Sequence, residues 1–307
     1  MRSILHDAPI TQGISCPGRW RIAFLWPLLL TLVLCGRTAW SAAPLKVFVS
    51  IPPQKYFVER LGGKHVSVSV IVEPGRSPAT YEPSPLQMSR LSGASLYFAI
   101  GVPFEDVWMT RIHAANPGMK IIALQEGIPL RGVDQVGDAG EGEGRKDPHI
   151  WTSPQLVQHM AGRIRDALIM EDPGHRSDYE ASYARFTADL EALDRYIRDR
   201  LRGLMGRSFM VFHPSWGYFA DNYGLRQIPI ERGGKMPGAR TLQRVIELGR
   251  REGVKVIFVQ EQFSTRTAET VARALGARIA RVDPVAEDYV KNMRHVADLF
   301  AEALGSR

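Results

Sequence analysis

SDYEASYARFTADLEALDRYIRDRLRGL, residues 177–204, is the longest uninterrupted helical pattern in this chain of 307 residues. Its apolar and aromatic residues recur at spacings close to three and four, at Tyr179, Tyr183, Phe186, Leu190, Leu193, Tyr196 and Ile197. Gly174 precedes the pattern and Gly203 closes it, as is usual at helix ends. A helix of this length extends roughly 40 Å at 1.5 Å per residue. It could therefore join two lobes; the alternative is a helix inside one larger domain.

Short apolar runs alternate with helical patterns on both sides of this segment. The expected strands are 45–50, 66–72, 96–100 and 120–124 before it, and 209–212, 227–230, 254–259 and 278–282 after it. Strands separated by helices favour parallel sheets built from βαβ units. The sequence therefore predicts an α/β fold of two similar lobes, each a parallel sheet flanked by helices, joined by one long rigid helix. The predicted boundaries are an N-terminal lobe at 44–175, the linker helix at 176–205 and a C-terminal lobe at 206–307.

The first 43 residues resemble a secretory signal peptide. Arg19 and Arg21 precede the apolar run 22–34, and small residues follow at Ala39 and 41–43. The run is shorter than the roughly 20 residues that a membrane span needs, so an anchor is the weaker alternative. Lipid attachment at Cys35 is also less favoured, because the preceding Leu34 is not small. We predict export to the periplasm with cleavage near residue 43.

Cysteine content and charge limit the possible chemistry. The two cysteines, Cys16 and Cys35, both fall in the leader, so the exported part would hold a metal only through histidine and carboxylate ligands. Removing the leader takes away four arginines and one aspartate and lowers the net charge from +7 to +4. A mild positive charge interspersed with acids does not indicate a nucleic-acid partner.

Three short segments place possible metal ligands next to proline: DPHIW (147–151), FHPSW (212–216) and VDP (282–284). They lie where a strand or loop passes into a helix, and ligand sites of α/β lobes form at the carboxyl ends of strands. His149, His213 and Asp283 offer two imidazoles and a carboxylate, a set that suits zinc. Alternatively, each histidine is structural and Asp283 caps a helix. The same set would also suit an exported metal-dependent hydrolase, although no nucleophile elbow or H-E-x-x-H motif accompanies it.

Six longer strings carry a resemblance to a known family; they are 74–88, 100–105, 147–151, 211–225, 256–264 and 282–294. Over residues 47–303 the chain resembles the zinc/manganese substrate-binding proteins of ATP-driven metal importers, the class with a rigid helix between two lobes. The resemblance implies a metal held between the lobes by His149, His213 and Asp283 and released to a membrane permease. Histidine at 213, where manganese-type members carry Glu, favours Zn²⁺ over Mn²⁺; Fe²⁺ is also less favoured as the cargo.

The chain also departs from this pattern. Ala79 stands where the family has a first-lobe histidine. Either three protein ligands and a water complete the site, or another group substitutes. Glu82 is a possible substitute ligand because positions 79 and 82 share a face of a helical turn; a cap or salt bridge is its alternative role. Three ligands with one open position also occur in catalytic zinc sites, which keeps the hydrolase alternative open.

Other histidines and loops receive less specific predictions. His65, His175 and His295 are expected not to be ligands, and the Gly-rich, acidic segment 132–146 is expected to be a surface linker. The combined prediction is a monomeric periplasmic solute-binding protein, not an enzyme. It would capture a divalent transition metal, preferably zinc, and deliver it to an ABC permease in the inner membrane. Binding of a metal chelate or another solute is the first alternative.

Overall fold

A computed structural model describes residues 43–136, 144–231, 235–263 and 265–305. The predicted signal peptide, apart from its last residue, and both cysteines lie outside the described residues. Residues 44–307 form one compact unit, and the description below concerns this unit.

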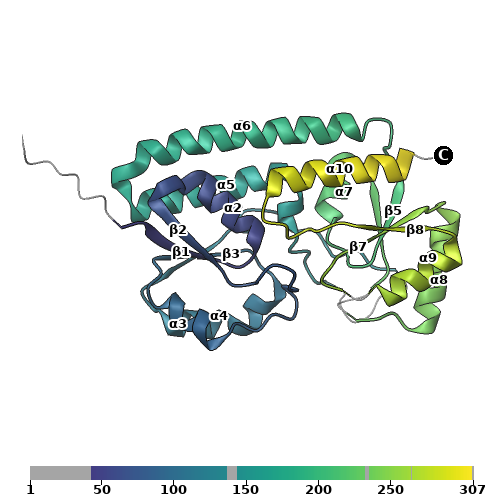
Figure 1. The fold of residues 1–307 in the computed structure, drawn as a ribbon, viewed down its shortest axis with the longest axis horizontal. Coiled ribbons are helices and arrows are strands. Elements are labelled where there is room, and N and C mark those ends of the chain that lie inside the picture. Colours follow the sequence, from purple (N-terminus) through teal and green to yellow (C-terminus); the bar gives the residue numbers. More distant parts are fainter. Residues whose placement is uncertain (1–42, 137–143, 232–234, 264, 306–307) are drawn as a thin grey trace, which may run out of the picture. The chain divides into compact units, whose positions relative to one another are not determined.

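The N-terminal half builds a four-stranded parallel sheet (Figure 1). Its strands are β1 (Leu45–Val49), β2 (Val66–Val70), β3 (Leu96–Ala99) and β4 (Lys120–Ala123), in the spatial order β2-β1-β3-β4. Val47 of β1 pairs with Val68 of β2 on one side and with Leu96 of β3 on the other. The intervening helices are α2 (Pro52–Gly62), which continues into the short 3₁₀ helix η1 (Gly63–His65), α3 (Pro85–Leu91) and α4 (Pro103–Ala115). β3 is buried along its whole length, as expected for a central strand between two helical layers.

The C-terminal half repeats this topology. Its strands are β5 (Ser208–Val211), β6 (Arg226–Pro229), β7 (Val256–Val259) and β8 (Arg278–Arg281), all parallel, in the order β6-β5-β7-β8. The helices are α7 (Gly217–Tyr223), α8 (Ala239–Arg251), α9 (Arg266–Leu275) and α10 (Tyr289–Gly305). The prediction of an α/β fold with two similar parallel sheets is confirmed, because both sheets share one strand order. The exact lobe boundaries stay predictions.

The connection between the sheets consists of η2 (Ile150–Thr152), α5 (Pro154–Glu171), η3 (Pro173–His175) and α6 (Arg176–Arg200). The α6 helix has 25 residues and is about 37 Å long at 1.5 Å per residue. Its fully buried face consists of Tyr179, Phe186, Leu190, Leu193 and Ile197. Tyr183 and Tyr196 are only partly buried, since they lie at the margins of that stripe. The helix ends four residues before residue 204, in a turn in which Leu204 donates to the carbonyl of Leu201.

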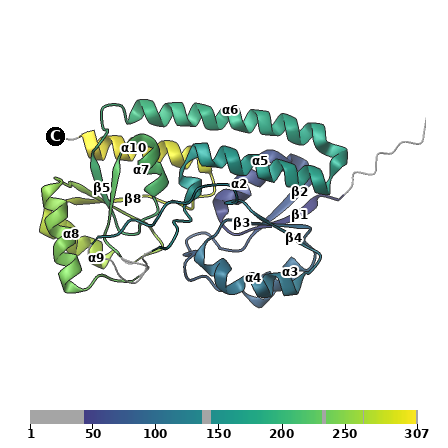
Figure 2. The same cartoon turned by 180° about the vertical axis from the view of Figure 1, so that it is seen from behind.

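A second helix strengthens the connection. The last helix, α10, packs along α6, so that both α5 and α10 lie beside it (Figures 1 and 2). At the start of α10, the ring of Tyr289 packs edge-on against Phe57 of α2, with 5.0 Å between the ring centres. Lys55 of α2 forms an ion pair with Glu287. One hydrophobic core consequently runs from α2 to Phe300 of α10 and includes residues of both halves.

None of the helices in the described ranges combines the length and apolar character needed to span a membrane.

Candidate metal centre

Two of the predicted ligands, His149 and His213, lie side by side, and we call them the cleft pair. His149 immediately precedes η2, and His213 lies two residues after β5. Their Nε2 atoms are 3.2 Å apart. The two histidines come from opposite sides of the linker helix in the sequence, so the tertiary fold is what brings them together.

A buried aspartate orients His149. The ring Nδ1 lies 2.6 Å from Oδ1 of Asp147, which also accepts the backbone N–H of His149 at 3.0 Å. Asp147 has no exposed surface, and its other oxygen lies 3.6 Å from Nη1 of Arg131. Burial lowers the pKa of His149, and the attraction of Asp147 opposes this shift only in part. The imidazole is therefore held neutral, which is the form that ligates metals.

A second buried carboxylate orients His213. Its Nδ1 lies 2.6 Å from Oε1 of Glu231, which is 4 % exposed. Gln260 fixes the backbone of the same residue, because its side chain donates to the carbonyl oxygen of His213 at 3.0 Å. The imidazole stacks on the ring of Phe263, with 5.0 Å between centres. Carboxylate, backbone and ring contacts thus leave this histidine little rotational freedom.

The geometry of the cleft pair suits a tetrahedral metal. When both Nδ1–H groups donate to carboxylates, both Nε2 atoms carry lone pairs. Two lone pairs at 3.2 Å repel each other unless a cation or proton lies close to both. Two nitrogen ligands on a tetrahedral zinc, with bonds of about 2.05 Å, lie about 3.3 Å apart. The carboxylate–histidine–metal arrangement is also the usual way in which proteins orient ligating imidazoles.

The pair lines a cavity of about 500 Å³. Ala79 lies in its wall, together with neighbouring residues of the β2–α3 loop. Arg145 and Lys146 also line it. The segment 132–146, which the sequence suggested was only a linker, therefore contributes its described ends to the cavity, and Gly132 pairs there with Lys146. Residues 137–143 lie outside the described part.

Comparison with known proteins identifies the family of this chain. The family described as "ZnuA: Zinc-uptake complex component A periplasmic" matches residues 47–303. The chain belongs to this family. The high-affinity zinc uptake system protein ZnuA of Bacillus subtilis is 26 % identical over 264 residues, which cover 81 % of this chain and 83 % of that protein. The zinc-binding lipoprotein AdcA of Streptococcus pneumoniae is 24 % identical over 266 residues, covering 83 % of this chain but 53 % of AdcA.

A solved structure confirms the fold of this ZnuA-family chain. The crystal structure of a ZnuA is 41 % identical and superposes with a TM-score of 0.79, over 85 % of this chain and 99 % of that one. The sequence-based recognition of a zinc/manganese-type binding protein is therefore confirmed.

The structure does not bring the other two predicted ligands to the cleft pair. Oδ1 of Asp283 accepts the backbone N–H of Val285 at 3.0 Å and the side-chain amide of Gln262 at 3.1 Å. Both partners line the cavity, whereas Asp283 does not. Within the described ranges, no third histidine, cysteine or carboxylate joins the cleft pair in a group whose ligand atoms, one from each residue, all lie within 4.8 Å of one another. Glu82 is exposed and lies outside the cavity lining, so its role as substitute ligand has no support from its position.

Sequence reasoning assigned no role to the two carboxylates that orient the cleft pair, Asp147 and Glu231. A signal for each was present. Asp147 lies two residues before a predicted ligand, and Glu231 lies two residues beyond the end of β6, as His213 does beyond β5. Parallel strands present such residues at the same edge of a sheet. A carboxylate at that position in a neighbouring strand was thus a candidate partner.

Proposed function

We propose that this chain is the exported zinc-binding subunit of an ATP-driven importer. The observation that carries the proposal is the cleft pair: two imidazoles, each oriented by a buried carboxylate, with their Nε2 atoms 3.2 Å apart. Membership of the zinc-uptake family and the zinc-binding names of relatives support it. Zinc is here the transported cargo rather than a resident cofactor. The family also favours transport over the hydrolase alternative.

The proposed ligands are His149, His213 and Asp283. The two imidazoles bind zinc first, because they already point at one location. Asp283 completes the set when its carboxylate exchanges the amide of Gln262 for the metal, and water occupies the side of Ala79. A charge-neutral imidazole pair with one carboxylate leaves a bound Zn²⁺ with a net positive charge, which limits affinity and eases release.

Release follows from the same groups. Neutral imidazoles are required for ligation, so acidification competes with zinc by protonating them. The continuous core below α5, α6 and α10 favours small adjustments in the cleft over wide separation of the lobes. The partner is an inner-membrane ABC permease, to which a monomeric binding protein in the periplasm would hand the metal.

One observation favours a second candidate, the binding of zinc with a small anionic chelator. The cavity of about 500 Å³ greatly exceeds the roughly 30 Å³ that one water occupies in liquid. Arg145 and Lys146 in its wall would attract anionic groups, and Ala79 leaves room beside the histidines. Zinc offered alone and zinc offered with citrate would distinguish the two candidates, since only a chelate binder retains citrate with the metal.

Equilibrium dialysis of metal-stripped protein tests the proposal. The parent should bind Zn²⁺ more tightly than Mn²⁺ or Fe²⁺, and His213→Ala should lose the cleft equivalent. His295→Ala is the matched control, because His295 lies exposed on α10, away from the cavity. If His213→Ala retained the zinc affinity and stoichiometry of the parent, the proposed ligands would be wrong. Asp283→Asn should weaken binding less than His213→Ala.

A further inference from the structure

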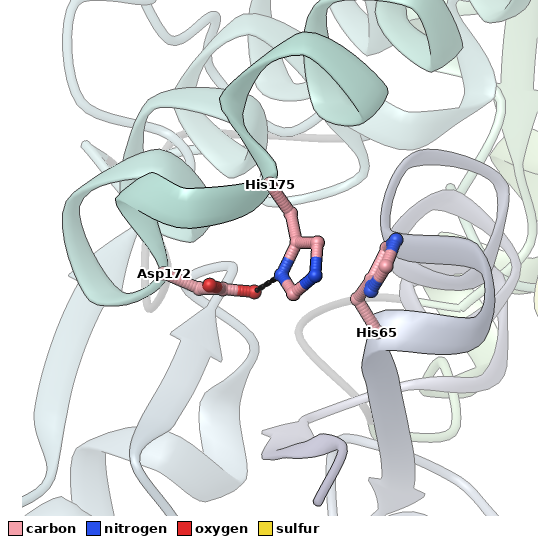
Figure 3. A group of neighbouring side chains, drawn as sticks. All are labelled: His65, Asp172 and His175. Carbon is pink, nitrogen blue, oxygen red and sulfur yellow. Dashed lines mark hydrogen bonds and ion pairs between the residues drawn. The ribbon is translucent and has the colours of Figure 1, made fainter. Parts of the chain in front are cut away.

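A second group of potential ligands lies at the base of the linker helix, and we call it the linker cluster. It consists of His65, Asp172 and His175 (Figure 3). His65 is the last residue of η1, directly before the edge strand β2. Asp172 ends α5, and His175 is the residue before α6. One short turn thus supplies two of the groups, and a distant segment of the chain supplies the third.

The spacing of the linker cluster is close to that of a metal site. One ring nitrogen of each histidine and one carboxylate oxygen all lie within 4.8 Å of one another. Ligand atoms of a tetrahedral zinc lie about 3.3 Å apart, so side-chain rotations that move these atoms by up to about 1.5 Å would close the set. The two imidazoles are stacked face to face, with 3.8 Å between ring centres and 27° between planes, so metal binding requires the rings to turn apart until both in-plane lone pairs meet at the ion. No other group of this kind is found among the described residues.

Neighbouring side chains orient the cluster in the manner of a metal site. Nε2 of His65 lies 2.8 Å from Oδ2 of Asp178, so its Nδ1 is the ring nitrogen that remains to ligate. The hydroxyl of Tyr179 donates to Oδ2 of Asp172 at 2.7 Å. Such outer hydrogen bonds fix the tautomer and rotation of ligands. Burial opposes ionisation of Asp172, but hydrogen bonds from Tyr179 and His175 outweigh it and lower its pKa.

The cluster also shows where a cation would enter. His175 Nδ1 and Asp172 Oδ2 are 2.6 Å apart and share one proton (dashed line in Figure 3). A divalent cation can replace that proton and bind both atoms while it attracts His65 from the opposite side. The side chains are 13 %, 26 % and 37 % exposed for His65, Asp172 and His175. Solvent can therefore reach the position and supply a fourth, water ligand.

We propose that His65, Asp172 and His175 form a second site for a divalent transition metal of the zinc class, separate from the transport cleft. Two imidazoles and one carboxylate are a borderline-soft donor set, which suits zinc and excludes calcium or magnesium as the preferred ion. The bound metal would clasp the first turn of α6 to η1 and the edge strand β2. It is a resident, stabilising ion rather than cargo. This site opposes the sequence-based expectation that His65 and His175 do not ligate.

Zinc stoichiometry of the full chain, stripped of metal with a chelator, tests the proposal. We expect two equivalents for the parent, one for His65→Ala/His175→Ala and one for His213→Ala. The variant carrying all three substitutions should bind none tightly. His295→Ala should still bind two. If His65→Ala/His175→Ala bound as many equivalents as the parent and the His295→Ala control, the second site would not exist.

Two further measurements keep the test decisive if the alanine variant folds poorly. His175→Gln retains the size and hydrogen-bonding capacity of the side chain, and far-UV circular dichroism checks its fold. In the His213→Ala background, Co²⁺ should show the visible absorption of a tetrahedral nitrogen–oxygen site, and His175→Gln should abolish it. Unchanged Co²⁺ absorption would overturn the proposal. Failure of the transport site affects the His213 variants only, so the two proposals fail independently.

Discussion

The cleft pair and the linker cluster use the same residue types in opposite ways. In the cleft, the carboxylates of Asp147 and Glu231 stand behind the imidazoles and orient them. In the linker cluster, the carboxylate of Asp172 lies among the ligand atoms themselves. The cleft histidines follow two different sheets, whereas the linker cluster joins one turn to one edge strand.

Under the two proposals, this difference lets one fold hold a metal for two purposes. Ligands that come from two lobes bind an ion whose release needs only a small shift of one lobe. Ligands on a short turn, packed against a neighbouring strand, bind an ion that remains as long as the fold does. Burial of His149 favours its neutral, ligating form. The partly exposed linker cluster has a carboxylate among its potential ligand atoms, and that carboxylate would compensate the charge of the metal.

Replacing the carboxylates that orient the cleft pair should produce the largest difference in zinc affinity between the two sites. Asp147→Asn and Glu231→Gln should each weaken zinc binding in the cleft about 10–100-fold, because each removes the partner of one Nδ1–H. Together they should weaken binding about 10²–10⁴-fold if they act independently. Competition with a zinc chelator measures both constants. Asp178→Asn is the matched control: it should weaken only the linker cluster, and any loss at the cleft would contradict the division.

With the cleft site removed, zinc should still stabilise the fold through the linker cluster. In the His213→Ala background, zinc at about 100 times the dissociation constant of that site should add about 2.7 kcal/mol to the free energy of unfolding. For a chain of this size, Tm should rise by about 5–10 °C in a thermal melt. Adding His65→Ala/His175→Ala should remove the rise. A rise of equal size in that variant would show that the stabilisation originates elsewhere.

Restoring a histidine at position 79 should strengthen the cleft. The loop is anchored, because Ser77 accepts the N–H of Ala79 and Pro78 accepts that of Phe104. Ala79→His should therefore place an imidazole on the cavity wall and tighten zinc binding about tenfold, or about 1.4 kcal/mol. Isothermal titration measures the change. Glu82→His, at an exposed position outside the cavity lining, should leave the zinc affinity unchanged. If both variants tightened zinc binding equally, the gain would not depend on the cavity.

Acid should destabilise the metal-free protein first through His149 in the cleft. This is the smallest of the four effects predicted here. Burial lowers the pKa of His149 below its ordinary 6.5, so the unfolded chain takes up a proton at a higher pH than the folded one. Stability is consequently lost as the pH falls from about 6.5 towards the folded pKa. Urea unfolding in chelator at pH 7.5 and 5.5 should show this slope, and His149→Asn should flatten it. The pKa of Asp172 is lowered from its ordinary 3.8, so this residue stabilises the fold above pH 3.8 and loses that stabilisation only in stronger acid.

The sequence alone determined the architecture and the position of the cleft pair. The periodicity of residues 177–204 predicted α6, and short apolar runs separated by helical patterns predicted both sheets, since both patterns are local properties of the chain. His149 and His213 could be placed near the carboxyl edges of strands because parallel topology directs such residues to one edge.

Tertiary structure decided which side chains meet. Asp283 follows β8 by two residues, as the same rule required, but its Oδ1 accepts hydrogen bonds from Val285 and Gln262, and the carboxylate does not group with the cleft pair. His65 and His175 looked unremarkable in isolation. They lie together because the turn between α5 and α6 packs beside the end of η1. Such contacts depend on the packing of segments distant in the chain and on side-chain rotamers, and no local pattern encodes either.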